Sequence, residues 1–213
     1  MDWAVLADFG TAIGTLVLAI ATFAATRSAT RSARLAERAL LEGLRPLLLA
    51  SSFGDETQKV RFVDATWLVV KGGRASMRID EDAVSLVLSV RNVGSGLAVL
   101  HGWSIAAAPE ALPPDPKDFH RLTRDIYVST SYVGFVQVAI RDPRSDAYLT
   151  VVDRVRRDEY VLVDVLYGDA EGTQRVITRF SVSKGPAEHP GDEAEYFVTV
   201  SRHWNIDLPA PRS

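Results

Sequence analysis

The first 25 residues contain a long apolar segment. No charged side chain occurs over the 17 residues 9–25, and the apolar stretch reaches back to Trp3 with only Asp8 interrupting it. As a helix, these two lengths span roughly 25 and 35 Å, which bracket the ~30 Å hydrocarbon core of a bilayer. The apolar residues lie on all faces of such a helix instead of forming one stripe. The pattern predicts a transmembrane helix in residues 1–25, whose main apolar side chains are Phe9, Ile13, Leu16, Leu18, Ile20 and Phe23.

A secretory signal peptide, a buried core helix and a surface amphipathic helix are the alternatives for this segment. A signal peptide has a positive N-terminal region, whereas this chain carries Asp2 and no Lys or Arg before Arg27. The basic residues directly after the span place its C-terminal side in the cytoplasm under the positive-inside rule. We therefore expect a single-pass protein of the cell membrane with its N-terminus outside. Asp8 then lies near the outer interface as a hydrated acid, and a functional intramembrane carboxylate is the alternative.

Two glycines four residues apart lie within the predicted span. Gly10 and Gly14 form a small-xxx-small pair, continued loosely by Ala21 and Ala25. Such spacing lets two helix backbones approach closely, so the pair predicts a helix-dimer face and a homodimer. The same spacing is common by chance in helices rich in small residues, and that alternative stays open.

The segment 26–45 predicts a basic amphipathic stalk that continues the membrane helix. It has no proline and is rich in Ala, Leu, Arg and Glu, which favour helix. Small apolar residues follow helical spacing on one face, and a neighbouring face is basic. Arginines near a membrane surface attract anionic lipids, so we expect lipid contact by Arg27, Arg31, Arg34 and Arg38. Gly43 and Pro46 end the helix because neither suits its interior.

Residues 46–205 predict a β domain, followed by a C-terminal tail at 206–213. Alternation of apolar residues is clear at Val84–Val90 and at Val161–Val165, which indicates half-buried antiparallel strands. The expected fold class is mainly β with an N-terminal helix, its domain an antiparallel sandwich of immunoglobulin-like type or a partly closed barrel. The candidate strands are Leu47–Ser52, Val60–Val70, Ala83–Arg91, Ala98–Ala107, Ile126–Ser129, Gly134–Arg141, Ala147–Val152, Glu159–Tyr167, Gln174–Ser183 and Glu195–Arg202.

Several local features belong to this domain. The segment Tyr167–Thr173 supplies Asp and Gly for a hairpin loop between two strands. The segments Pro109–Pro116 and Gly185–Glu195 are expected to be exposed loops. Three tryptophans are expected to pack in the core or at its edge: Trp67, Trp103 and Trp204.

Composition excludes several kinds of chemistry. The chain has no cysteine, which removes disulfides, thiolate metal sites and cysteine nucleophiles. Its formal net charge is −3, so we expect no nucleic-acid partner. The histidines form no metal-binding motif, and Asp80-Glu81-Asp82 lacks the alternating spacing of a calcium loop. We therefore expect no metal and no cofactor.

No catalytic motif is present either. Gly94-Ser-Gly96 precedes a strand-like run, whereas a phosphate-binding loop opens a helix. The nucleophile elbow G-x-S-x-G is also missing. The cluster of Asp115, Asp118 and His120 in a proline-rich loop is the remaining catalytic candidate and would make the protein a hydrolase. Because surface loops collect such residues freely, we expect a protein that is not an enzyme.

One turn resembles an element of a known group. The run Leu86-x-Leu88-x-Val90-Arg91-Asn92-Val93-Gly94-Ser95-Gly96-Leu97-Ala98 is similar to the "strand, N-x-G-x-G-x-A, strand" element of uncharacterised bacterial single-span membrane proteins. In these proteins an Arg/Ala-rich juxtamembrane helix ends in Arg-Pro, here Arg45-Pro46, and precedes an immunoglobulin-like β domain. Their later Y-x-D-x-x-G hairpin resembles Tyr167–Thr173, with Asp169 and Gly172 in place. The resemblance implies a fold and supplies no function.

These patterns favour a membrane-tethered, noncatalytic interaction or sensing module of unknown process. Its partners would be the lipid bilayer and a cytoplasmic protein, bound through loops or edge strands. The alternative of another class is an oligomerising membrane effector whose β domain binds a small, anionic ligand and clusters the spans through Gly10 and Gly14. A hydrolase is the third hypothesis.

Overall fold

The structure is a computed structural model that describes residues 3–185 and 195–208. The chain divides between Gly43 and Leu44 into two compact units, a helix and a β domain. Each unit is described by itself below.

The helical unit is one continuous helix, α1 (Trp3–Gly43). The predicted span and stalk therefore share a single helix, which ends where Gly43 and Pro46 were expected to end it. Threonine hydroxyls inside it donate to carbonyls one turn back, for example Thr22 Oγ1 to Leu18 O at 2.7 Å. These threonine hydroxyls are therefore already hydrogen-bonded within α1, although the helix surface around them is exposed.

The second unit is a β domain of antiparallel strands with two short helices. Among the described residues, nine strands form one sheet, and β2 and β3 form a separate hairpin. Its elements are β1 (Leu48–Ala50), β2 (Gln58–Arg61), β3 (Trp67–Val70), β4 (Arg74–Ile79), β5 (Val84–Asn92), β6 (Ala98–Ala106), η1 (Pro116–Asp118), β7 (His120–Val128), β8 (Val133–Ile140), α2 (Asp146–Arg156), β9 (Val161–Gly168), β10 (Arg175–Lys184) and β11 (Tyr196–Asn205).

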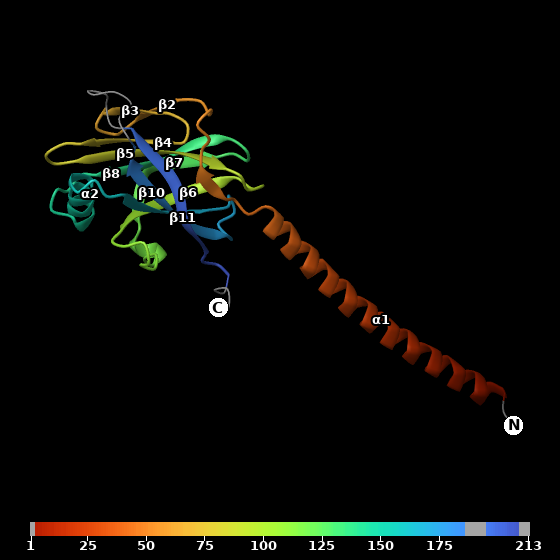
Figure 1. Cartoon of the computed structure of the whole chain (residues 1–213). Helices are drawn as coiled ribbons and strands as arrows, with labels where there is room; N and C mark the ends of the chain where they lie inside the picture. Colours follow the sequence, from red (N-terminus) through yellow and green to blue (C-terminus); the bar gives the residue numbers. More distant parts are fainter. Residues whose placement is uncertain (1–2, 186–194, 209–213) are drawn as a thin grey trace. The chain divides into compact units, whose positions relative to one another are not determined.

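The sheet curls into a half-barrel (Figure 1). Its order is β1-β5-β4-β11-β10-β9-β6-β7, and β8 pairs with the remaining edge of β5. β7 and β8 thus lie at opposite ends of the sheet, yet only residues 129–132 separate them in the chain. A connection this short joins the two ends because the sheet bends back on itself. Of the two expected forms, the partly closed barrel is therefore the one that the domain adopts.

The main core fills the inside of the curled sheet. The alternation predicted for Val84–Val90 and Val161–Val165 is confirmed in that every second residue belongs to this core. The expected half-burial is wrong, because the other faces of β5 and β9 are also buried. α2 packs against it through Tyr148 and Val151. The Tyr148 hydroxyl also donates toward the carbonyls of Asp80 and Glu81, both at 2.9 Å, which ties α2 to the β4–β5 turn.

The predicted strand Ala147–Val152 is wrong, because this segment lies in α2. Ser145 caps the helix by accepting a hydrogen bond from Tyr148 N, and Tyr148 and Val151 are buried three residues apart. The β-branched residues of this short run imitate a strand, while the cap and the three-residue spacing are helical signals.

Three strand boundaries also differ from prediction. The single strand expected at Val60–Val70 is a hairpin, because Ala65 adopts a positive φ of 64° and Phe62 N donates to Thr66 O at 2.8 Å. β4 was not predicted, since its sequence mixes polar residues with few apolar ones. β7 begins at His120, six residues before the predicted strand at Ile126.

Two smaller clusters cover the outside of the half-barrel. The β2–β3 hairpin buries Val60, Leu68 and Val70 against Val87 of β5. On the other side, Phe119 covers Leu166 and Ile177. Trp103 is buried in the main core and Trp204 packs beside Phe119, but Trp67 is 57% exposed, so its predicted packing role is wrong.

An ion pair is fully buried on this outer face. Arg179 donates to Asp164 through Nε at 2.6 Å and through Nη2 at 2.7 Å, and both side chains are completely buried. The second Nη group donates to the carbonyls of Ala108, Pro109 and Ala111. The guanidinium therefore fastens the proline-rich loop to the sheet, and its charge is compensated.

The chain passes into the β domain over the turn that carries the N-x-G-x-G motif. Asn92 is fully buried and accepts hydrogen bonds from Leu47 N at 3.2 Å and Gly94 N at 3.0 Å. Its amide donates to Gly96 O at 2.7 Å and to Val128 O at 2.9 Å. We call this end of the half-barrel, formed by residues 44–47, 92–97 and 129–132, the junction end.

The two glycines of this motif allow the close approach of the chain. A Cβ at Gly94 would lie 2.4 Å from Arg45 O, and one at Gly96 would lie 1.8 Å from Leu44 O. Both contacts are with backbone, which cannot move aside as a side chain can. Gly94 and Gly96 are therefore structural, as the sequence context indicated.

We predict that Gly96→Ala destabilises the β domain by about 1–3 kcal/mol, because the new methyl group forces residues 44–47 off the turn. Gly54→Ala is the matched control, since a Cβ at Gly54 meets nothing within 4 Å. Thermal unfolding of the detergent-solubilised full chain, followed by circular dichroism, measures both. Equal midpoints for the two variants would contradict the steric role of Gly96.

Candidate functional site

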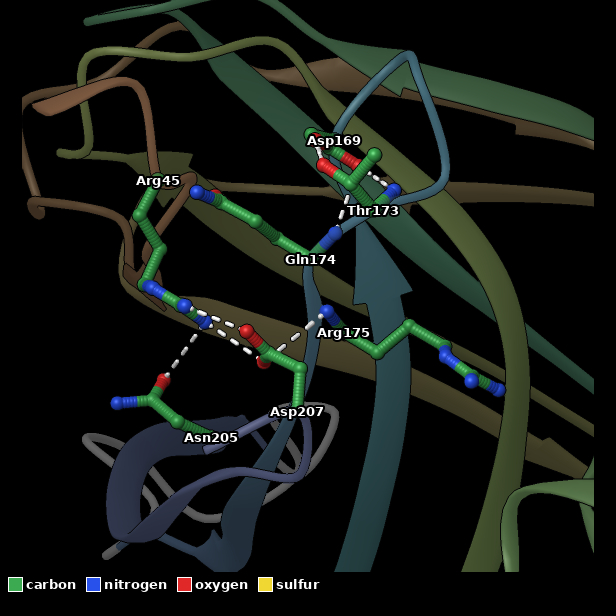
Figure 2. A network of polar contacts seen from close by, with 7 residues as sticks. All are labelled: Arg45, Asp169, Thr173, Gln174, Arg175, Asn205 and Asp207. Carbon is green, nitrogen blue, oxygen red and sulfur yellow. Dashed lines mark hydrogen bonds and ion pairs between the residues drawn. The ribbon is translucent and has the colours of Figure 1, made fainter. Parts of the chain in front are cut away.

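The first residues of the β domain are held by an ion pair with Asp207, which follows β11 (Figure 2). Arg45 Nη1 donates to Asp207 Oδ1 at 2.9 Å and Nη2 donates to Oδ2 at 2.6 Å, so the pair is bidentate. Asn205 Oδ1 lies 3.4 Å from the same Nη1, and Arg175 N donates to Asp207 at 3.3 Å. The hydrogen bonds from Arg45 hold the pKa of Asp207 below its usual value. The segment after α1 is thereby locked to β10 and β11.

A buried hydroxyl chain adds a second attachment for the same segment. Leu48 N donates to the Tyr167 hydroxyl at 3.0 Å, and this hydroxyl lies 2.9 Å from Thr178 Oγ1. Thr178 Oγ1 in turn lies 2.9 Å from His203 Nδ1. Burial raises the pKa of Tyr167 to about 12, so the phenol stays protonated. β1 is therefore joined to three other strands by polar contacts as well as by packing.

The predicted hairpin between β9 and β10 is confirmed, and its aspartate has a structural role. Asp169 Oδ1 accepts from Thr173 N at 2.8 Å and Gln174 N at 3.0 Å, and Oδ2 accepts from Thr173 Oγ1 at 2.5 Å. Burial opposes ionisation of Asp169, but these hydrogen bonds together lower its pKa. The carboxylate is thus occupied inside its own loop, as Figure 2 shows.

A pocket of about 680 Å³ lies beside this network. Arg175, Gly172 and Ile206 line it from the β9–β10 hairpin and the end of β11, and Leu166 forms an apolar part of the wall. The segment Asp115–Lys117 closes the opposite side, and His101 reaches in from β6. Four stretches that are distant in the sequence meet here.

His101 is the extra residue of a β-bulge in β6. Leu100 is opposite Tyr167 and Gly102 is opposite Leu166, so His101 has no partner in β9. Its Nε2 would lie 3.1 Å from a Cβ at Gly168, so the missing side chain at Gly168 leaves room for the imidazole. Burial lowers the pKa of His101, and the positive charge of Arg175 lowers it further against the opposing effect of Asp169 and Asp125.

The three residues of the predicted catalytic cluster, Asp115, Asp118 and His120, have different surroundings in the structure. Asp115 lines the pocket, and its carboxylate accepts from Lys117 N at 3.1 Å as the cap of η1. His120 instead stacks on Trp103, with ring centroids 4.5 Å apart, and Asp118 is exposed on η1. The hydrolase hypothesis on Asp118 and His120 stays untested.

The predicted membrane residues lie along α1. Ile13, Leu16, Leu18, Ile20 and Phe23 are between 53% and 69% exposed, and a Cβ added at Gly14 would meet nothing within 4 Å. Arg27, Arg31 and Arg34 are exposed as well. The side chains of Phe9 and Arg38 and the surroundings of Gly10 lie outside the described part.

Among the described residues, one helix, within Ile13–Gly43, is long and apolar enough to cross a membrane, and its apolar window is not buried. The dimer face and the lipid contacts of the arginines stay predictions.

Sequence reasoning missed His101 and Arg175. Neither belongs to a motif, and only the pairing of β6 with β9 and of β9 with β10 brings them to one place. The buried pair Asp164–Arg179 left a signal at Asp164 alone, since this charge interrupts an otherwise apolar strand.

An N-terminal helix followed by a curled antiparallel half-barrel defines the class of this protein. No family model matches the chain, and a search among curated proteins finds no similar sequence. Among solved structures, it is similar to a crystal structure of a protein from Archaeoglobus fulgidus at 13% sequence identity, with 64% of this chain and 96% of that one covered and a TM-score of 0.24. A likeness this low carries no argument, and the resemblance of the Asn92 turn to bacterial single-span proteins stays a prediction.

Asp207→Asn should destabilise the β domain by about 1–3 kcal/mol at pH 7, because it removes a bidentate charge-assisted pair with Arg45. The folded-state pKa of Asp207 is depressed, so this stability is present above the unfolded pKa near 4 and is lost as pH falls through the lower folded value. The difference between wild type and variant should therefore shrink below about pH 4. Unfolding midpoints between pH 7 and pH 3 measure it, with the exposed Asp118→Asn as control. A difference that is independent of pH would contradict the role of the ion pair.

Proposed function

We propose that this protein is a membrane-tethered, noncatalytic interaction or sensing module with its β domain on the cytoplasmic side. The observation that carries the proposal is the character of α1. Its apolar first part is exposed at Ile13–Phe23, its arginines begin about one turn later at Arg27, and it leads directly into a domain with its own core. A helix with an unburied apolar surface of this length finds its apolar surroundings in a bilayer.

The β2–β3 hairpin supports a contact with a cytoplasmic protein. Its inner side is buried against β5, while its outer side presents Trp67 and Val69, which are 57% and 51% exposed. Lys59 is opposite Val69, and the Arg61 guanidinium lies 6.0 Å from the centre of the Trp67 ring. Exposed aromatic residues beside arginine are enriched in protein interfaces. We infer that this face binds the partner.

The absence of native cysteine makes the topology directly measurable. We expect Cys at position 56 (Glu56→Cys), in an exposed loop of the β domain, to react with a membrane-impermeant maleimide only after bacterial cells are permeabilised. Asp2→Cys should react in intact cells. The cysteine-free wild type is the blank, and both variants should stay in the membrane pellet after alkaline extraction. The reverse labelling pattern would overturn the orientation, and release from the pellet would overturn the tether.

Trp67→Glu should abolish partner capture without unfolding the domain, because Trp67 is largely exposed. Affinity purification from a detergent extract compares it with wild type and with Leu149→Glu, which places the same charge on exposed α2. Species recovered with wild type and Leu149→Glu but missing with Trp67→Glu are those bound through the hairpin. If recovery is identical for all three, the hairpin is not the interface.

A further inference from the structure

The pocket beside the junction end contains side chains that the fold itself does not use. The Arg175 backbone donates to Asp207, but its guanidinium makes no hydrogen bond or ion pair with any residue that the structure describes. Figure 2 shows this side chain extending away from Asp207. The imidazole of His101 likewise forms no hydrogen bond within the described ranges. Two donors therefore face an open space of about 680 Å³.

The charges around the pocket leave it attractive to an anion. Asp169 stays ionised, but its oxygens are occupied by three hydrogen bonds within its loop, and Asp207 is compensated by its bidentate pair with Arg45. Asp115 is the remaining carboxylate in the lining, and Lys117 Nζ lies 3.5 Å from it. Arg175 is the cation left without a counter-charge at this site. Guanidinium groups suit phosphate and carboxylate because they present parallel donors.

The shape of the pocket indicates what accompanies the anionic group. Its volume falls in the range of small-molecule sites and exceeds what an inorganic ion fills. Leu166 and Ile206 provide apolar wall beside the donors. Arg175, His101 and Lys117 come from three different segments, and a tetrahedral phosphoryl group can accept from several directions at once. The suitable occupant is an organic phosphate with an apolar part.

We propose that this pocket binds a small molecule carrying a phosphate monoester, with Arg175 as its main anchor and His101 and Lys117 as further donors. This proposal deepens the sensing role and rests on it for its biological meaning, whereas binding is measured independently of topology. Because Arg175 N also holds Asp207, which in turn holds Arg45, the ligand would lie two contacts away from the start of the domain.

The test uses the full chain in phosphatidylcholine nanodiscs. Adenosine monophosphate is the soluble probe, adenosine is its uncharged counterpart, and nanodiscs that contain phosphatidic acid present the same monoester on a lipid. Calorimetry should show binding of adenosine monophosphate and none of adenosine. Arg175→Gln should weaken this binding roughly tenfold or more, because a charged hydrogen-bond donor is lost. Arg156→Gln, which removes an exposed arginine of α2, should leave it unchanged.

Histidine NMR provides a second readout. A bound phosphate favours the imidazolium form, so the pKa of His101 should rise when adenosine monophosphate is added. Lipid-dependent shifts without a response to adenosine monophosphate would assign the site to a headgroup and still support it. Absence of binding and of a His101 shift with both phosphate probes, or equal binding by Arg175→Gln, would overturn the proposal. Neither outcome affects the cysteine-labelling test of the tether.

Discussion

The β domain depends on the hydrogen bonds of Asn92, which hold the chain where it enters the domain after α1. Asn92 uses its whole side-chain amide for this, with two donors bound to its oxygen and two carbonyls bound to its nitrogen, all within a fully buried site. These bonds reinforce, at one buried point, the strand pairing of β1 with β5 and of β6 with β7. A buried amide left partly unsatisfied is costly, so the arrangement forms completely or not at all. The bidentate pair of Arg45 with Asp207 secures the same segment from the opposite side.

The fold class was predictable from the sequence because period-two alternation reports which face of a strand is buried. Val84–Val90 and Val161–Val165 were correctly identified as strands for this reason, although their second faces are buried as well. α2 was misinterpreted because its β-branched residues outweigh a single capping serine. The sequence did not distinguish a sandwich from a barrel, because strand patterns do not show how a sheet curves. The curvature became clear only from the pairing, which puts β7 and β8 at opposite ends of the sheet.

The candidate site was hardly predictable, and the reason is topological. Asp115 was singled out from its proline-rich loop, but its neighbours in the pocket come from strands whose pairing had first to be known. His101 interrupts the apolar–polar alternation of β6. The sequence alone does not identify this interruption as a bulge, because the bulge is defined by the missing partner of His101 in β9. Arg175 looks like an ordinary strand-end cation until Asp207 is seen to bind only its backbone.

A strand residue usually has to satisfy both the pairing of the sheet and the packing of its side chain, and the bulge frees His101 from the pairing with β9. By adding one position, it moves Trp103 into the core opposite Val165, and this shift depends on the backbone and not on the imidazole. The side chain at 101 is therefore released from the demands of folding. If the pocket binds a ligand as proposed, substitution at this position would change the pocket lining while the pairing of β6 with β9 on either side of the bulge is kept.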